Sequence, residues 1–470
     1  MNNKLKIGFL PTRRNVHGPK FCNLEVAQKS KNEIEGFLKS KKIDFVNLDF
    51  LNEEGLIYSV LDAPSVAKKF IAEDVDAIFA PHVNFGTEDA VAKVGKLVGK
   101  PFLLWGPRDK TPDSDDGGRY TDTQCGLFAT GKVLKQYDVP FTYIINSDLT
   151  DDVFLRGFDS FMAVSAVVKS FKSLRIGQIG TRPQEFLSVK FNELELLERF
   201  GIEVVPITMI DLKSKFEDTL KNKSSKIDSE IEMWHSCCQV KINKDEQRRT
   251  AALKIAIRDW AEEEQLAAAV GSCWQPMTAV AGVHPCFTFA DLTGEGFPVI
   301  CEVDVHGAVS SIMAQAASLW TRPTFLADLT MRHPTNDNAE LLWHCGVFPR
   351  HLAKDSKPAL GETFDGPLAS GGVYELKGGD ITIARFDVSK GNYSLLMGHG
   401  KGIEGPATHG TYMWAEFKDW AKWERKFVEG PYIHHCTGIH GKYAPILFEA
   451  CKYIDGLTPD PVDTEDCREG

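Results

Sequence analysis

Residues 271–307 read GSCWQPMTAVAGVHPCFTFADLTGEGFPVICEVDVHG. In this stretch an apolar run at 297–301 is followed by two carboxylates, Glu302 and Asp304, and then by a His-Gly pair. The run predicts a buried strand that delivers acids to a site at its end. Side chains two apart in a strand point to the same face, so Glu302 and Asp304 are expected to converge on one pocket. Such a pair suits metal binding or acid/base chemistry, and two solvated acids at a strand end are the alternative.

Upstream of this stretch, strand patterns and helix patterns alternate. Within residues 1–165 the strand patterns lie near 4–10, 45–50, 76–80, 101–105 and 140–145. Such alternation predicts a parallel, doubly wound sheet, in which ligands bind beyond the carboxyl ends of the strands. Residues 166–317 repeat the pattern and form a second α/β domain, which carries the Glu-x-Asp strand end.

Three polar loops are expected at the carboxyl ends of the first sheet, at residues 12–20, 82–88 and 106–120. They contain Arg14, His17 and Asn84, which either contact a polyhydroxylated or anionic ligand or are simply solvated. No G-x-G-x-x-G or P-loop follows the first strand, which argues against a nucleotide site of either common kind.

The sequence changes character after residue 317. Turn residues become frequent, and short strand patterns appear at 373–376, 381–388, 393–397 and 411–417. They predict an antiparallel, β-rich domain of sandwich or barrel type. The predicted fold class is therefore α/β, with two Rossmann-like doubly wound domains followed by a β-rich, barrel-type C-terminal domain, with boundaries at 1–165, 166–317 and 318–470.

The composition restricts the partners and the compartment. The 470 residues include 54 Lys and Arg against 65 Asp and Glu, a net charge of −11, which argues against nucleic acid or an anionic membrane as the partner. No apolar run reaches the roughly 18 residues of a membrane span, and the first residues lack a secretory signal pattern. The eleven Cys lie mostly in apolar runs and are interpreted as reduced thiols of a cytoplasmic protein.

Two histidine motifs stand out in the third domain. His434 and His435 are adjacent, so in an extended chain at most one of them enters a given site; a packed or surface histidine is the alternative. His344, in a Trp-His-Cys-Gly segment, is interpreted in isolation as a core histidine with a satisfied hydrogen bond. One carboxylate pair with one distant histidine would make an oxygen/nitrogen site of the sort that Mn²⁺ or Mg²⁺ occupies.

An ordered set of motifs gives the chain a resemblance. They are PTRR at 11–14, GTE at 86–88, GQIG at 177–180, CEVDVHG at 301–307, WHCG at 343–346 and IHH at 433–435. With them the chain resembles the L-fucose/L-arabinose isomerase family, and most closely its shorter fucose-isomerase-like branch, over nearly its whole length. The resemblance implies two Rossmann-like domains and a β-barrel-type domain, usually in a homo-oligomer, a hexamer.

The resemblance also implies an activity. The family interconverts aldoses and ketoses through a cis-enediol with a divalent metal, typically Mn²⁺. By position, Asp304 matches the family's metal-binding Asp, and His435 matches its ligand His. The family's further metal-binding Glu is expected upstream, but residues 273–277 read CWQPM and contain no carboxylate. Glu302 is predicted to supply the missing acid.

The sequence thus predicts a metal-dependent aldose–ketose isomerase for a hexose or pentose, including a modified or anionic sugar. A sugar-binding or regulatory protein without isomerase activity is the alternative, and a metal-assisted epimerase or carbon–carbon lyase is a third class. The predicted cofactor is Mn²⁺, with Mg²⁺ or Co²⁺ as alternatives. The candidate residues are Glu302 and Asp304 for catalysis, Asp304, His435 and Glu302 for the metal, and Arg14, His17, Asn84, Trp274, Gln275 and His344 for the substrate.

Overall fold

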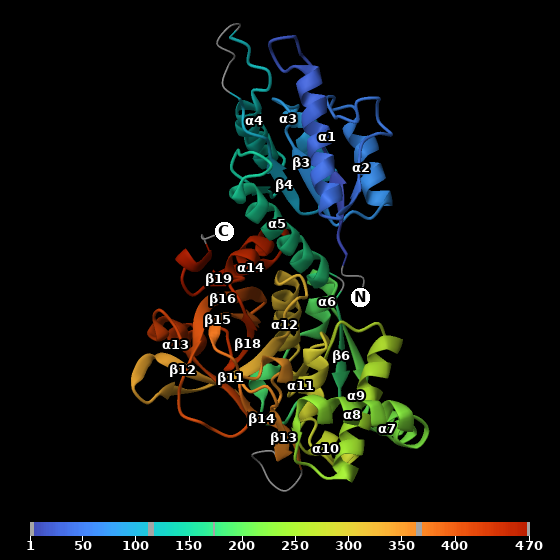
Figure 1. Ribbon diagram of the computed structural model, residues 1–470, viewed down its shortest axis with the longest axis vertical. Helices are drawn as coiled ribbons and strands as arrows, with labels where there is room; N and C mark the ends of the chain where they lie inside the picture. The colour runs from blue at the N-terminus through green and yellow to red at the C-terminus, as the bar shows by residue number, and fades with distance from the viewer. Residues whose placement is uncertain (1–3, 111–116, 173, 363–368, 468–470) are drawn as a thin grey trace. The chain divides into compact units, whose positions relative to one another are not determined.

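A computed structural model describes residues 4–110, 117–172, 174–362 and 369–467 of the chain (Figure 1). The chain forms two compact units. The N-terminal unit comprises Asn2–Lys169 and Lys452–Asp455, and the large unit comprises Ser170–Cys451 and Gly456–Glu469. The predicted finer division at residues 317 and 318 stays a prediction. Part of the predicted loop at 106–120, residues 111–116, lies outside the described residues.

The N-terminal unit contains a five-stranded parallel sheet in the order β2-β1-β3-β4-β5. The order is that of the flavodoxin-like variant of doubly wound sheets, so parallel α/β architecture is confirmed here. Strands β3 and β4 are buried along their whole length, which explains their uninterrupted apolar sequences. The elements are β1 (Lys6–Phe9), α1 (Leu24–Ser40), β2 (Asp44–Val46), α2 (Ala63–Ala72), β3 (Ala77–Pro81), α3 (Glu88–Val98), β4 (Phe102–Trp105), α4 (Thr123–Gln136), β5 (Thr142–Tyr143) and α5 (Asp152–Phe171).

The loops after β1 and β3 meet at the carboxyl ends of these neighbouring strands, as predicted. Thr12 forms a parallel bridge with His82. The backbone N–H of Arg14 donates to Oδ1 of Asn84 at 2.8 Å, and the N–H of Thr87 donates to the Thr12 hydroxyl at 3.0 Å. These bonds bind the two loops to each other.

The large unit begins with a four-stranded parallel sheet in the order β10-β9-β6-β7. Its strands are β6 (Arg175–Ile179), β7 (Glu203–Ile207), β9 (Ala268–Gly271) and β10 (Val299–Cys301). The helices of this region are α6 (Glu193–Phe200), α7 (Met209–Asn222), α8 (Ser224–Cys237), α9 (Lys244–Glu263), α10 (Gln275–Ala281), α11 (Cys286–Gly294) and α12 (Val305–Ala317), and β8 (Gln239–Val240) lies between α8 and α9.

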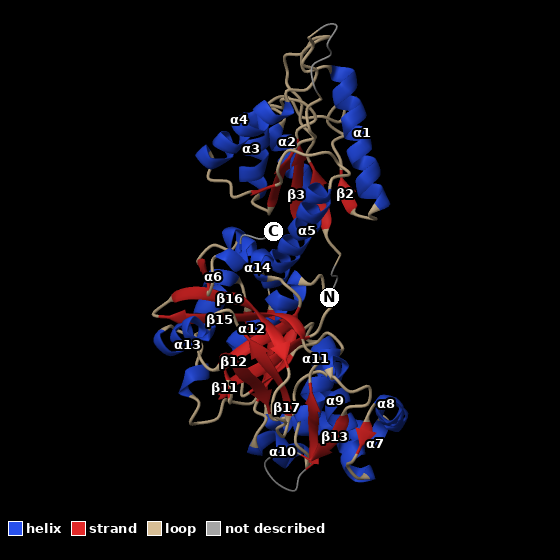
Figure 2. Cartoon of the chain, turned by 60° about the vertical axis from the view of Figure 1, so that its left-hand side comes forward, coloured by secondary structure: helices blue, strands red, loops and turns tan. Residues whose placement is uncertain are grey.

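A closed antiparallel barrel forms the second part of the large unit (Figure 2). Its six strands pair in the order β16-β15-β18-β11-β12-β17, and a β16–β17 pairing completes the ring. They are β11 (Thr324–His333), β12 (Asn336–His344), β15 (Gly379–Ser389), β16 (Asn392–Ile403), β17 (Thr411–Glu416) and β18 (His435–His440). Outside the ring lie β13 (Ala359–Glu362), β14 (Ala369–Glu375), α13 (Trp420–Glu429), α14 (Ala444–Ala450) and β19 (Leu457–Pro461).

The barrel confirms the predicted β-rich C-terminal region, with two differences. Strands β11 and β12 were not predicted, because the turn residues at 334–338 suggested a loop; these residues instead form the tip of a hairpin. Strand β14 pairs parallel with β17, so the expected antiparallel arrangement is wrong at that edge.

Helix α12 connects the parallel sheet to the barrel. All thirteen of its residues are buried, and it packs on β9 and β10 on one side and on β15 and β18 on the other. Its many Ala, Ser and Gly residues allow this close approach to two sheets. The helix therefore holds its N-terminal end, at Asp304, between β10 and the barrel.

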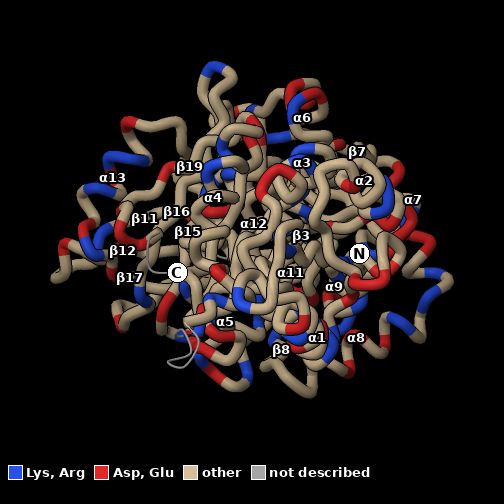
Figure 3. Tube along the Cα trace, turned by 90° about the horizontal axis from the view of Figure 1, so that it is seen from above, with Lys and Arg blue, Asp and Glu red and all other residues tan. Residues whose placement is uncertain are grey.

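The surface carries both signs of charge. In Figure 3, Lys and Arg alternate with Asp and Glu along helices such as α7 and α13. None of the described helices is both long and apolar enough to cross a membrane.

Candidate active site

The two predicted carboxylates lie on a strained turn rather than on a strand. Strand β10 ends at Cys301, and Glu302 and Val303 adopt left-handed backbone conformations with φ of +63° and +60°. Asp304 then forms the N-cap of α12 and accepts the N–H of Gly307 at 3.0 Å. The expectation that strand alternation aligns Glu302 and Asp304 is therefore wrong. A β-branched residue such as Val303 disfavours this conformation, and consecutive residues of this kind mark a functional turn.

Both carboxylates nevertheless meet at His435, the first residue of β18. Oε2 of Glu302 lies 3.0 Å from its Nε2, and Oδ2 of Asp304 lies 3.0 Å from its Nδ1. Asp328 on β11 is the direct cross-strand partner of His435, and its Oδ1 lies 3.5 Å from Nε2. The fully buried imidazole therefore has one carboxylate at its Nδ1 edge and two at its Nε2 edge.

A buried arginine engages both oxygens of Asp304. Arg385 of β15, with no exposed side-chain surface, binds Oδ2 through Nη1 and donates from Nη2 to Oδ1 at 3.1 Å. Two residues further along the same strand, Asp387 accepts from Nε of Arg385 at 3.0 Å and lies 3.1 Å from Nδ1 of His306. Asp304 is thus held by Arg385, by Gly307 and by His435.

The pKa values of this cluster follow its charges. Burial alone would raise the pKa of Asp304, but Arg385 and His435 outweigh it and hold that pKa well below its usual range. Burial alone would lower the pKa of His435, but the adjacent carboxylates of Asp304 and Glu302 raise it to about 9. Asp304 is therefore an ionised anchor for the imidazole.

Four buried atoms at this place make no hydrogen bond of regular geometry within the part of the chain that the structure describes, and two of them, Oε2 of Glu302 and Nε2 of His435, lie 3.0 Å from each other. They are Oε2 of Glu302, Oδ1 of Asp328, Nε2 of His435 and Nε2 of His344. Buried polar atoms are almost always satisfied, so open atoms that converge from different strands indicate a ligand. Asp304 accepts at Nδ1 of His435, so a metal that replaced the Nε2 proton would bind a nitrogen that faces Glu302 and Asp328, an arrangement common at metal sites.

The donor set fits a divalent ion that prefers oxygen and nitrogen. Asp328, His434 and His435 offer ligand atoms that lie within 4.8 Å of one another, and Glu302 touches the same Nε2. Carboxylate and imidazole donors suit Mn²⁺ or Mg²⁺. The described residues therefore include a group able to hold the predicted kind of cofactor, without fixing which metal it is.

A pocket of about 810 Å³ adjoins the Glu302 turn. Nε1 of Trp274 donates to Oε1 of Glu302 at 3.3 Å, and the half-exposed indole packs edge-on against Phe186 at 5.3 Å between centroids. The pocket lining includes Arg182, Lys190, Ser272, Trp274, Gln275 and Val303. It provides a polar chamber beside a candidate acid.

The predicted substrate-binding residues belong to both units. Trp274 and Gln275 line the pocket, and the ring of His344, at the end of β12, lies 6.4 Å from that of His435. In the N-terminal unit, Arg14 pairs with Glu88 at 2.6 Å, the buried Asn84 joins the two loops, and His17 is exposed. Within the large unit the structure brings together Glu302, Asp304, His435, Trp274 and His344.

Sequence reasoning missed Asp328, Arg385 and Asp387. Each lies in an otherwise apolar strand pattern, TFLAD at 324–328 or ITIARFDV at 381–388. A charged residue on the apolar face of such a pattern must be paired or bound when buried. The three charged residues were therefore a visible signal in the sequence, but the residues with which they pair lie far away along the chain.

A protein family and several known isomerases are similar to this chain in sequence. Residues 16–172 match the family described as "Fucose/sulfoquinovose isomerase, N-terminal domain". A sulfoquinovose isomerase of Priestia aryabhattai is 25% identical over 394 residues, which cover 82% of this chain and 84% of that protein. One of Alkalicoccus urumqiensis is 26% identical over 406 residues, with 86% of each chain covered. One of Clostridium sp. (strain MSTE9) is 22% identical over 276 residues, with 58% and 60% covered.

Proposed function

This chain is a relative of the L-fucose/L-arabinose isomerase family, as its motifs predicted, and we propose that it is an aldose–ketose isomerase acting on an anionic sugar. Relatives named sulfoquinovose isomerase support an isomerase enzyme, and their name suggests a sulfonated sugar as the substrate. The observation that carries the proposal is the convergence of open, buried carboxylate and imidazole atoms beside a polar pocket.

In this proposal His435 and Asp328 hold the metal, and Glu302 lies beside it. The metal, when bound, polarises the sugar carbonyl and stabilises negative charge on its oxygen. Asp304 fixes the imidazole through Nδ1, so that Nε2 points to the two other carboxylates. The role of Asp304 as a ligand in its own right stays a prediction, because Arg385 and Gly307 already bind its oxygens.

Glu302 is the residue to which we assign proton transfer. Its Oε1 accepts from the Trp274 indole, and its Oε2, 3.0 Å from Nε2 of His435, is the oxygen that would accept the proton. Removal of the proton from C2 of the aldose and its return to C1 pass through a cis-enediol on one face of the sugar. A single carboxylate in hydrogen-bonding reach of both carbons can perform both steps.

The pocket lining supports an anionic sugar. Arg182 donates from Nη1 to the backbone oxygens of Pro183 and Gln184, at 2.8 and 3.0 Å, which fixes its guanidinium. Among the described residues, neither Arg182 nor Lys190 is in an ion pair with a carboxylate. The lining also contains Glu185 and Glu193, and a fixed guanidinium beside a lysine is a suitable partner for a sulfonate or a phosphate.

The test is an isomerisation assay with purified protein on sulfoquinovose and on glucose, with Mn²⁺ and with a chelator. We expect ketose formation from the anionic sugar that the chelator abolishes and Mn²⁺ restores. Binding without turnover would instead identify a sugar-binding protein.

The Arg182→Ala variant tests the charge of the substrate. We expect its KM for the anionic sugar to rise far more than its KM for a neutral one. Arg425→Ala is the matched control, because Arg425 is exposed and pairs with Glu429. Equal effects of Arg182→Ala on both sugars would contradict an anionic substrate.

A further inference from the structure

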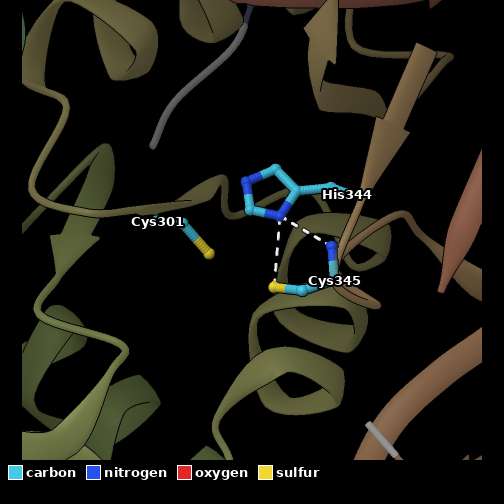
Figure 4. Close-up of side chains that lie close together, drawn as sticks. All are labelled: Cys301, His344 and Cys345. Carbon is cyan, nitrogen blue, oxygen red and sulfur yellow. Dashed lines mark hydrogen bonds between the residues drawn. The ribbon is translucent and has the colours of Figure 1, made fainter. Parts of the chain in front are cut away.

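A group of cysteine thiols lies next to residues of the candidate active site. Cys301 is the last residue of β10, Cys345 follows β12, and Cys286 begins α11. Cys345 is half-buried and the other two are buried, and none of them forms a disulfide. Figure 4 shows Cys301 and Cys345 directed toward the imidazole of His344. Three distant parts of the chain thus bring sulfur atoms to one place.

The spacing of these donors is that of ligands around one tetrahedral ion. Sγ of Cys345 lies 3.6 Å from Sγ of Cys286 and 3.2 Å from Nδ1 of His344. The donor atoms of Cys301, His344 and Cys345 all lie within 4.8 Å of one another. A tetrahedral zinc ion with bonds of about 2.3 Å to sulfur holds its sulfur ligands about 3.8 Å apart. Cys301, His344 and Cys345 are close enough together as a group of three, and Cys286 adjoins this group through its contact with Cys345.

We propose that Cys286, Cys301, Cys345 and His344 bind a soft divalent metal ion of the zinc type, in a site separate from the one that serves the isomerase reaction. Three cysteines and one histidine form a common zinc ligand set. Binding converts three thiols to thiolates and releases their protons to solvent.

The two sites differ in donor chemistry. The site at Glu302, Asp328 and His435 offers carboxylate oxygens and one imidazole, which suit Mn²⁺ or Mg²⁺. The thiol site offers sulfur, which selects zinc or another soft ion. The same protein can therefore hold two different metals at once.

His344 connects the two sites. Its Nδ1 accepts the N–H of Cys345 at 2.9 Å, and a metal ion at this nitrogen would have to replace that hydrogen bond. Its Nε2 is buried without a hydrogen-bond partner among the described residues. An ion at Nδ1 would fix the proton on Nε2 and present an N–H toward the neighbouring site. The soft metal would then act as a positioning element for His344 and not as the reaction's own metal.

Co²⁺ is the probe that separates the two sites. Co²⁺ bound to thiolates gives a charge-transfer absorption that an oxygen/nitrogen site lacks. We expect titration of the reduced, full-length protein with Co²⁺ to produce this absorption with one equivalent. Zn²⁺ should then remove it and Mg²⁺ should not.

Variants locate the site. Cys286→Ser and Cys345→Ser should each lower the Co²⁺ affinity, measured from the thiolate absorption, by about 100-fold or more. The substitution Cys125→Ser, at an exposed residue, is the control and should leave this affinity unchanged. The proposal is overturned if the reduced wild-type protein gives no thiolate absorption, or if the absorption survives in both variants. It is also overturned if mass spectrometry finds Cys286 and Cys345 joined in a disulfide in the protein as purified under reducing conditions.

Discussion

Two buried clusters of charged side chains in the large unit differ in how completely their polar atoms are hydrogen-bonded. Around Lys254, the Nζ atom donates to Glu230 and Glu295 at 2.6 Å each and contacts Asp291. Asp291 also accepts from Trp234 at 2.9 Å and from Arg350 at 2.7 Å. Among the described residues, every buried side-chain oxygen and nitrogen of this first cluster is hydrogen-bonded. In the second cluster, around His435, Glu302 Oε2, Asp328 Oδ1 and His435 Nε2 make no hydrogen bond of regular geometry.

The difference distinguishes a structural cluster from a binding site. Glu230, Asp291 and Glu295 are close enough together to suggest a cation site, but the ammonium of Lys254 already occupies the cation's place. At His435 the basic partner, Arg385, lies on the Nδ1 side with Asp304 and leaves the Nε2 side free. Proximity of acids alone is therefore a poor guide, and unfilled hydrogen-bonding capacity is a better one.

The largest expected effect comes from Glu302→Gln. The amide keeps the contact with Trp274 but cannot accept the proton, so kcat should fall by about 10²- to 10⁴-fold. The melting temperature should change little. Steady-state kinetics and thermal unfolding measure both, with the exposed Glu429→Gln as the control. A variant with unchanged kcat would place Glu302 among structural acids such as Glu230.

Lys254→Met should show the opposite behaviour, with a large loss of stability and little change in kcat. Its loss leaves three carboxylates without their central partner, and removal of one partner from a buried cluster costs about 3–5 kcal/mol of unfolding free energy. Lys215→Met, which breaks a partly exposed pair with Glu263, should cost about 0–1 kcal/mol. Denaturant unfolding measures the difference. A loss of metal affinity in Lys254→Met without a loss of stability would show that the two clusters had been assigned the wrong way round.

Asp304→Asn and Asp387→Asn form a matched pair. Each leaves Arg385 with a single carboxylate, but only Asp304 contacts Nδ1 of His435. Both variants should lose stability to a similar degree, while only Asp304→Asn should lower Mn²⁺ affinity, by about 10- to 100-fold. Calorimetric titration with Mn²⁺ makes the comparison. Equal Mn²⁺ affinities in the two variants would rule out an orienting role for Asp304.

Much of this architecture was predictable because it depends on local periodicity. Alternating strands and helices predicted both parallel sheets, and frequent turn residues predicted the β-rich region after residue 317. The turn at Glu302 and Val303 was not predictable, because a left-handed Val has no signature in a single sequence. Glu302 and Asp304 therefore both contact His435 because of this turn, and not because of strand alternation.

The partners of the site could not be predicted for a different reason. His435 and Asp328 face each other because β18 and β11 pair in one register, and Arg385 reaches Asp304 across 81 positions of sequence. Pairing between distant strands is decided by tertiary packing, and local patterns carry no record of it. The motif set named Asp304 and His435 as candidates, whereas Asp328 and Arg385 became candidates only through the fold.

The smallest expected effect concerns acid stability. Burial alone would raise the pKa of Asp291, but Lys254 and Arg350 outweigh it and hold that pKa below its usual value. A depressed carboxyl pKa contributes stability above the unfolded value, near pH 4, and this contribution is lost as the pH falls below it. Wild-type protein should therefore lose stability between pH 5 and pH 3 more steeply than Asp291→Asn, by at most about 1.4 kcal/mol per pH unit. Urea unfolding at several pH values measures the two slopes, and parallel curves would mean that the charge of Asp291 does not stabilise the cluster around Lys254.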